Sequence, residues 1–349
     1  MTESGKRNVK ISVIMSAYNA ADYIETSVQS LLVQTYANFE LIVIDDCSRD
    51  ATGEILEKLA KHDPRIILIK NNVNEGLTKN LNKAFRHSNG KYIARMDSDD
   101  IARYDRLEKQ AKYLDIHTDI DICGSWAYRI DEKGVGHIKL KPKVNDCEIK
   151  ARLVCGNFIV HPSVMMRREV LKKTPYDESY RTIQDYKLWI DCWDMKFHNI
   201  PECLMYYRDN KKGISRTERK KTAERLAVLD RAYGALFGKI GIKVSDDERK
   251  VFVKCMHSLT NFENRRESDY ALEVCRSIAG KYPGIDMRCM FSRWARGNAK
   301  LPSLKNIGIW LAGYVYWYIE AFGMLLKPWD LVPANRNKAA ENRERAGIL

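Results

Sequence analysis

The alternation of strand and helix patterns in the first hundred residues is the feature that most constrains the fold. Apolar, β-branched runs that predict strands lie at residues 9–15, 40–44, 65–69 and 92–96. Amphipathic segments that predict helices fill the intervals between them, and Asp22 and Glu25 have the spacing of a capping box at the start of the first helix. Strands that alternate with helices form right-handed βαβ units. The sequence therefore predicts an α/β fold with a mostly parallel central sheet flanked by helices.

Polar residues follow three of these predicted strands. The loops are Ser16 to Asn19, Asp45 to Arg49 and Asp97 to Asp100. Ligands of open parallel sheets bind at the carboxyl ends of the strands, so we expect these loops to converge on a ligand. Each aspartate could instead cap the helix that follows it, but that explanation accounts for one loop better than for three.

The loop after the fourth strand carries three carboxylates, Asp97, Asp99 and Asp100, and no lysine. Mg²⁺ and Mn²⁺ are held by one or two carboxylates, with substrate phosphates and waters completing the shell. The alternative is an acidic turn that caps the next helix. The chain lacks both G-x-G-x-x-G after the first strand and the G-x-x-x-x-G-K-[ST] phosphate loop. Phosphate charge is then met by a metal at Asp97 and Asp99, which leaves Asp46 free to accept N–H groups of a base.

The formal net charge of +13 calls for an anionic partner: nucleic acid, an anionic membrane or a phosphate-rich substrate. Much of the excess lies behind the motif-bearing half, and the basic run from Lys211 to Arg225 contains no aromatic residue. Nucleic-acid binding by base stacking needs aromatic residues, which argues against that partner. Nine scattered cysteines, without a C-x-x-C pair or an apolar leader, predict reduced thiols and a cytoplasmic location.

Four segments resemble successive signatures of glycosyltransferase family 2. They read Val-Ile-Met-Ser-Ala-Tyr-Asn19, Phe-Glu-Leu-Ile-Val-Ile-Asp-Asp46-Cys-Ser, Asn74-Glu-Gly76 and Tyr92-Ile-Ala-Arg-Met-Asp-Ser-Asp-Asp100. The resemblance covers roughly residues 9–210. It implies the GT-A fold, an inverting mechanism and a nucleoside-diphosphate sugar as donor.

The resemblance also implies roles for single residues in binding the donor. Ser16 and Tyr18 border the nucleobase, with uracil the expected base, and Asp46 bonds to it. Asn74 and Gly76 belong to the same donor site.

The resemblance assigns binding of the remaining parts of the donor to the acidic loop. Asp97 and Asp99 serve ribose, diphosphate and a Mn²⁺ or Mg²⁺ ion, with Asp99 as the direct ligand. Near the end of the resemblance, Asn210 stands where family members often carry a histidine. An amide oxygen coordinates Mn²⁺ more weakly than imidazole does, so metal binding would depend more on Asp99 and the donor diphosphate.

Thr182-Ile-Gln-Asp185-Tyr-Lys-Leu-Trp189 resembles the family's Glu-Asp-Tyr-x-Leu-Trp signature, whose aspartate is the general base. Inversion needs one carboxylate opposite the leaving diphosphate to take the proton of the acceptor hydroxyl. Alternatively, Asp185 only caps the helix that follows it. Gln184 stands where the family usually has glutamate, which changes the neighbour of the base. His161, before a proline in an apolar run, is either functional or a satisfied structural residue.

The order of motifs predicts the domain organisation. Residues 1–8 form a disordered leader, residues 9–215 a catalytic domain and residues 216–349 a helical C-terminal region. Within the catalytic domain, residues 9–100 bind the nucleotide sugar and residues 101–215 form the acceptor half. Segments 121–130 and 135–140 predict a hairpin, and segments 247–262 and 270–279 predict helices of the C-terminal region.

Residues 307–326 form an apolar segment with a single charge. That length just suffices to span a bilayer. Its aromatic residues, among them Trp310 and Trp317, suit the depth of lipid headgroups instead. We expect a membrane-interfacial helix, with a buried helix and a true span as alternatives.

These patterns predict a metal-dependent inverting glycosyltransferase on the cytoplasmic face of a membrane. The expected donor is a UDP-sugar, and the expected acceptor is a hydroxyl of a lipid-linked saccharide in surface polysaccharide synthesis. A catalytically silent sugar-nucleotide binder and a basic nucleic-acid-binding protein are the alternatives.

Overall fold

The computed structural model describes residues 10–210, 222–257, 262, 264–282 and 284–296. They fall into two compact units. The sheet unit contains residues 10–144 and 159–210, and the helical unit contains residues 145–158 together with the described residues from 222 onward. Residues 145–158, which lie inside the range predicted for the catalytic domain, thus pack with the helical unit.

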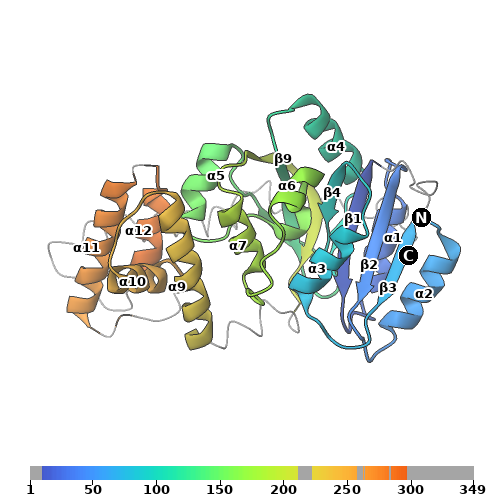
Figure 1. Cartoon of the computed structure of the whole chain (residues 1–349), viewed down its shortest axis with the longest axis horizontal. Helices are drawn as coiled ribbons and strands as arrows, with labels where there is room; N and C mark the ends of the chain where they lie inside the picture. The colour runs from blue at the N-terminus through green and yellow to red at the C-terminus, as the bar shows by residue number, and fades with distance from the viewer. Residues whose placement is uncertain (1–9, 211–221, 258–261, 263, 283, 297–349) are drawn as a thin grey trace. The chain divides into compact units, whose positions relative to one another are not determined.

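The sheet unit is built on a nine-stranded sheet with the order β3-β2-β1-β4-β8-β6-β9-β5, and β7 pairs with β6 (Figure 1). The strands are β1 (Ile11–Ala17), β2 (Phe39–Asp45), β3 (Ile66–Lys70), β4 (Tyr92–Arg95), β5 (Ile101–Ala102), β6 (Ile122–Ile130), β7 (Gly136–Leu140), β8 (Met165–Arg167) and β9 (Phe197–Arg208). The first four strands are parallel, as the alternating pattern predicts. Beyond β4 the sheet is mixed, because β8 runs antiparallel to both β4 and β6. The predicted α/β class and the predicted hairpin of β6 and β7 are both confirmed.

Helices flank both faces of this sheet (Figure 1). In the sheet unit they are α1 (Ile24–Leu32), α2 (Thr52–His62), α3 (Leu77–Arg86), α4 (Arg106–Ile116), α6 (Arg168–Lys173), α7 (Gln184–Asp191) and the 3₁₀ helix η1 (His161–Ser163). The predicted capping box is wrong: α1 begins after Tyr23, and no side chain caps it. The main core includes fully buried residues of β1 and α1, such as Met15 and Val28. Strands covered on both faces read as continuous apolar runs, which is why their pattern was legible in the sequence.

The helical unit consists of α5 (Asp146–Leu153), α9 (Thr222–Lys239), α10 (Asp246–His257), α11 (Arg265–Lys281) and α12 (Met287–Arg296). Its core includes a cluster of rings from α9 and α10, in which Tyr233 and Phe237 contact Phe252. Predicted helices at residues 247–262 and 270–279 correspond to α10 and α11. The segment 307–326 lies outside the described residues. Among the residues that are described, no helix has the length and apolar character needed to cross a membrane.

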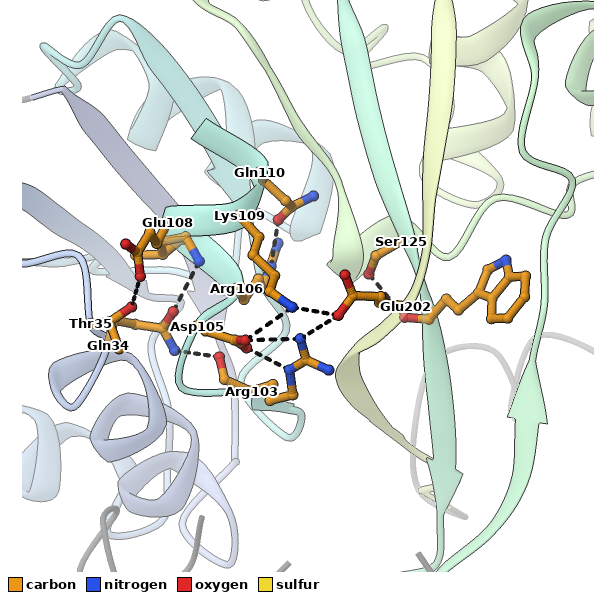
Figure 2. Close-up of polar contacts among 12 residues, drawn as sticks. Gln34, Thr35, Arg103, Asp105, Arg106, Glu108, Lys109, Gln110, Ser125 and Glu202 are labelled. Atoms are coloured by element: carbon orange, nitrogen blue, oxygen red, sulfur yellow. Dashed lines mark hydrogen bonds and ion pairs between the residues drawn. The ribbon is translucent and has the colours of Figure 1, made fainter. Parts of the chain in front are cut away.

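A polar network behind the acidic loop ties α4 to β9 and to the end of α1 (Figure 2). Arg103 bonds to Asp105 and to Glu202, with 2.9 Å between Nη2 of Arg103 and Oε2 of Glu202. Lys109 reaches the same Glu202 oxygen at 2.5 Å. Gln34 accepts from the backbone N–H of Leu107 and donates to the carbonyl of Arg103. The segment that follows the acidic loop is therefore held by Glu202 of β9 on one side and by Gln34 on the other.

The turn before β4 supplies the first prediction. A Cβ at Gly90 would lie 2.5 Å from the Ser12 backbone nitrogen and 2.7 Å from the Ile11 carbonyl carbon. Neither atom can move without disturbing β1, so Gly90→Ala is expected to lower the free energy of unfolding by about 2 kcal/mol or more. Urea unfolding measures this. Gly136→Ala is the control, because its Cβ would make only ordinary contacts; equal stability of the two variants would contradict the prediction.

Candidate active site

The acidic loop after β4 gathers three carboxylates in one place. Ligand oxygens of Asp97, Asp99 and Asp100 all lie within 4.8 Å of one another. Asp100 is completely buried, whereas Asp97 and Asp99 are partly exposed. The predicted metal ligands Asp97 and Asp99 are thus brought together, and Asp100, the third carboxylate of the Asp-Ser-Asp-Asp motif, lies beside them.

The electrostatics of this cluster favour a cation. Burial, followed by the negative charge of Asp97, raises the pKa of Asp99. Burial and both neighbouring carboxylates raise the pKa of Asp100 well above its usual range. In addition, Oδ2 of Asp100 is buried without a hydrogen-bond partner among the described residues. Crowded, desolvated oxygens with an unsatisfied acceptor fit a hard divalent cation such as Mg²⁺ or Mn²⁺.

The end of β9 fixes the acidic loop through residues 208 and 210. The backbone N–H of Arg208 donates to Oδ1 of Asp100 at 2.7 Å, and its Nε donates to the carbonyl of Asp99 at 2.7 Å. Asn210 donates from Nδ2 to Oδ2 of Asp99 at 2.9 Å. Asn210 therefore lies at the predicted metal site. The sequence analysis did not single out Arg208 as the anchor of the loop.

Asp46 organises the loops beside the cluster. It is buried, and its carboxylate accepts from Nδ2 of Asn71 at 2.8 Å and from the backbone N–H groups of Glu75 at 2.8 Å and Gly76 at 2.9 Å. Asn74 donates to the carbonyl of Asp46 at 3.3 Å. Gly76 has φ of 87°, a conformation that favours glycine. The structure therefore brings Asp46, Asn74 and Gly76 together, and it shows that the Asp46 carboxylate holds the loop that contains Gly76.

The loops after β1 and β2 are joined to each other. The backbone N–H of Asn19 donates to Oγ of Ser48 at 3.1 Å, and Oδ1 of Asn19 accepts from the N–H of Arg49 at 2.8 Å. Ser16 accepts from Nδ2 of Asn80 at 3.1 Å. Tyr18 is 46% exposed, so its ring is accessible to a planar ligand.

Asp185 lies in the first turn of α7. Its Oδ1 accepts from the backbone N–H of Tyr186 at 2.8 Å. The residue before the helix, Ile183, has φ of 55°, which is strained for a β-branched side chain. Strain of this kind is often found at functional sites. The charges of both Asp185 and Asp97 help to raise the pKa of Tyr176, after the larger effect of burial.

His161 is a satisfied buried residue. Its Nε2 lies 2.8 Å from the hydroxyl of Tyr176, and its ring packs edge-on against Trp189 of α7 at 5.8 Å between centroids. Burial, and next the charge of Arg95, lower its pKa well below the usual range. The lowered pKa favours neutral His161 near pH 7. Its contacts match the predicted alternative of a satisfied structural residue.

Comparison with known proteins places this fold and site in one class. Residues 12–174 match the model of glycosyl transferase family 2. The chain is 41% identical over 218 residues to the uncharacterized glycosyltransferase MJ1057 of Methanocaldococcus jannaschii, covering 60% of this chain and 75% of that protein. The chain belongs to glycosyl transferase family 2, and it is a glycosyltransferase.

Two Escherichia coli relatives carry more specific names. The O-antigen biosynthesis glycosyltransferase WbnJ is 33% identical over 215 residues, or 59% of this chain and 82% of WbnJ. The UDP-Glc:alpha-D-GlcNAc-diphosphoundecaprenol beta-1,3-glucosyltransferase WfaP is 31% identical over 221 residues, or 63% of this chain and 85% of WfaP.

Solved structures establish the GT-A fold. Residues 1–349 of S. aureus TarS in complex with UDP-GlcNAc match with a TM-score of 0.58 and 16% identity, over 90% of this chain and 92% of that one. The mannosyltransferase PcManGT from Pyrobaculum calidifontis, in complex with GDP-Man and Mn²⁺, matches with a TM-score of 0.51 and 15% identity, over 91% and 88%. The expected fold class and family are therefore confirmed.

The carboxylate cluster supplies the second prediction. A metal that binds only the folded protein stabilises it, so Mn²⁺ at roughly one hundred times its Kd should raise the melting temperature by about 5 °C or more. The effect should decline as the pH is lowered, because protons compete for carboxyls whose pKa values are raised. Asp99→Asn should abolish the shift in a thermal scan. Asp115→Asn should keep it, since Asp115 bonds to Lys10 and Lys91 instead. An undiminished shift in Asp99→Asn would refute the assignment.

Proposed function

We propose that this glycosyltransferase is metal-dependent and inverting, and that it transfers a sugar from a nucleoside-diphosphate donor, with UDP as the nucleotide. The observation that carries the proposal is the cluster of Asp97, Asp99 and Asp100 at the end of the parallel strand β4, which pairs with β1, while β1 pairs in turn with β2, the strand that Asp46 follows. Support comes from structural neighbours whose titles name UDP-GlcNAc, and GDP-Man with Mn²⁺.

Donor binding follows from the loops at the carboxyl edge of the sheet. Ser16 and the exposed ring of Tyr18 border the base, and Asp46 accepts a base N–H while holding Asn74 and Gly76 in place. Asp97 and Asp99 would serve the ribose, the diphosphate and a Mn²⁺ or Mg²⁺ ion, with Asp99 as the direct ligand. The ion would neutralise the diphosphate and supply Lewis-acid assistance to the leaving nucleoside diphosphate.

Asp185 acts as the general base of the transfer. Its carboxylate takes the proton of the acceptor hydroxyl while the acceptor oxygen forms a bond to the anomeric carbon. The bond from that carbon to the diphosphate oxygen breaks on the opposite face, so the configuration inverts. Asp185 lies in the first turn of α7, where the helix N-terminus stabilises negative charge.

The proposed acceptor is a diphosphate-linked lipid saccharide of surface polysaccharide synthesis. The names of WbnJ and WfaP support this class, and the net charge of +13 suits an acceptor that carries phosphate at an anionic membrane. On this proposal residues 9–215 form the catalytic domain, and residues 216–349 bring it to the cytoplasmic face of the membrane as a peripheral protein. The alternative is a catalytically silent binder, motivated by Gln184 and Asn210.

A third prediction tests the reaction. Asp185→Asn should keep the affinity for the donor within about threefold but lower the rate of transfer by about a thousandfold or more, because a positioned base contributes 10²–10⁴-fold. Release of nucleoside diphosphate from UDP-, GDP- and dTDP-sugars, with Mn²⁺ or with EDTA, measures both donor choice and metal dependence. Asp191→Asn, on the last turn of the same helix, is the matched control. Donors that bind but are never consumed, even with lipid-linked acceptors, would favour the silent binder.

A fourth prediction tests membrane association. Replacing Trp310 and Trp317 together by alanine in the full chain should weaken binding to anionic vesicles by about tenfold, since interfacial anchoring depends on aromatic side chains. Co-sedimentation with vesicles of phosphatidylglycerol and phosphatidylcholine measures it. The control replaces Trp126 and Trp193, which lie outside the predicted interfacial segment. Unchanged binding of the first variant would remove residues 307–326 from the membrane proposal.

A further inference from the structure

Arg95, the last residue of β4, is a buried cation beside the acidic cluster. Its side chain is 3% exposed, and its Nη2 forms an ion pair with Oδ1 of Asp97. Its Nε and Nη1 are buried and have no hydrogen-bond partner among the described residues. Burying a guanidinium with two unsatisfied nitrogens costs free energy, so the hydrogen bonds of this side chain do not explain its presence.

A second buried arginine shows what a structural role looks like in the same core. Arg106 donates from Nε to Gln110 at 3.0 Å and from Nη2 to the carbonyl of Arg95 at 2.8 Å. Its Nη1 contacts Sδ of Met205 at 3.0 Å. Every nitrogen of the Arg106 guanidinium thus has a partner. Arg95, in contrast, forms an ion pair with Asp97 and leaves two of its nitrogens without a partner among the described residues.

The charge of Arg95 acts on both sides of β4. Toward the acidic loop, it lowers the pKa of Asp99 and Asp100 against the larger, opposite effect of burial. Toward α7, it lowers the pKa of His161, and together with Asp185 and Asp97 it acts on the pKa of Tyr176. Arg95 is therefore a shared counter-cation between the predicted metal site and the layer that contacts the base-bearing helix.

We propose that Arg95 is a positioning residue that holds Asp97 in an internal ion pair, so that the divalent cation is bound mainly by Asp99 and Asp100 while Asp97 stays oriented toward the donor. This inference rests on the proposed metal-dependent function. The Arg95 pair restrains Asp97, whose side chain is 30% exposed, and Asn210 and Arg208 restrain Asp99 and Asp100. Without Arg95, a third unpaired carboxylate would be released to the cation.

The test measures Mn²⁺ affinity by calorimetry on metal-free protein, without donor. Arg95→Met should bind Mn²⁺ about tenfold more tightly than the wild type, because a neighbouring positive charge is removed and Asp97 is freed. Arg95→Lys should stay within about threefold of the wild type because it keeps the charge. The matched control is Arg167→Met at the other end of the β4–β8 pair, where Arg167 bonds to the carbonyls of Ile120 and Leu114. It should lose stability but keep its Mn²⁺ affinity.

A second set of variants keeps the test decisive if Arg95→Met does not fold. Asp97→Asn should weaken Mn²⁺ binding by at most about threefold, whereas Asp99→Asn should weaken it by about a hundredfold. In the Arg95→Met background, the same Asp97→Asn change should weaken binding by about tenfold, since the two side chains are coupled.

The outcomes separate the inference from the function on which it rests. Equal losses in Asp97→Asn and Asp99→Asn, or an Arg95→Met protein with wild-type or weaker Mn²⁺ affinity, would overturn the role of Arg95 while leaving metal dependence intact. A wild type that does not bind Mn²⁺ at all would overturn both.

Discussion

The repulsion among three carboxylates at the end of β4 is the constraint on which the rest of the site depends. Asp97, Asp99 and Asp100 lie within 4.8 Å of one another in a largely buried loop, where like charges interact strongly. The fold surrounds them with compensating groups, namely Arg95 at the end of the adjoining strand β4 and Arg208 from the distant end of β9. The proposed metal, bound together with donor phosphates, would complete the same compensation at this edge of the sheet.

The donor side of the site is held by backbone groups more than by contacts between side chains. Asp46 uses both of its oxygens to fix the turn that contains Gly76, and Asn19 and Ser48 join the neighbouring loops. Asn19 and Cys47 both have positive φ, with values of 48° and 61°. Backbone strain of this kind persists only where surrounding contacts over-determine it. The surrounding contacts therefore hold the loops of the proposed nucleotide site in one shape.

Helix α7, which carries Asp185, is connected to the acidic loop through a buried aromatic layer. Trp189 of α7 contacts His161, which bonds to Tyr176, and Tyr176 responds to the charges of Asp97 and Asp185. A neutral histidine in this layer avoids a further positive charge near Arg95. The three rings of this layer are neutral, so they add no charge between Asp97 and Asp185, which both act on Tyr176.

The sequence by itself determined the fold class, the family and the edge of the sheet that forms the site. Apolar runs on parallel strands are covered on both faces, so their periodicity and the polar loops after them are legible locally. The predicted capping box at Asp22 failed because tertiary contacts override local capping preferences. Only the tertiary structure decided that Arg208 anchors the acidic loop, that residues 145–158 join the helical unit, and that Arg95 pairs with Asp97 while Arg106 does not. The contact of Arg208 joins residues that are 109 positions apart, and side-chain packing selects Arg95 as the partner of Asp97. No local sequence pattern records either.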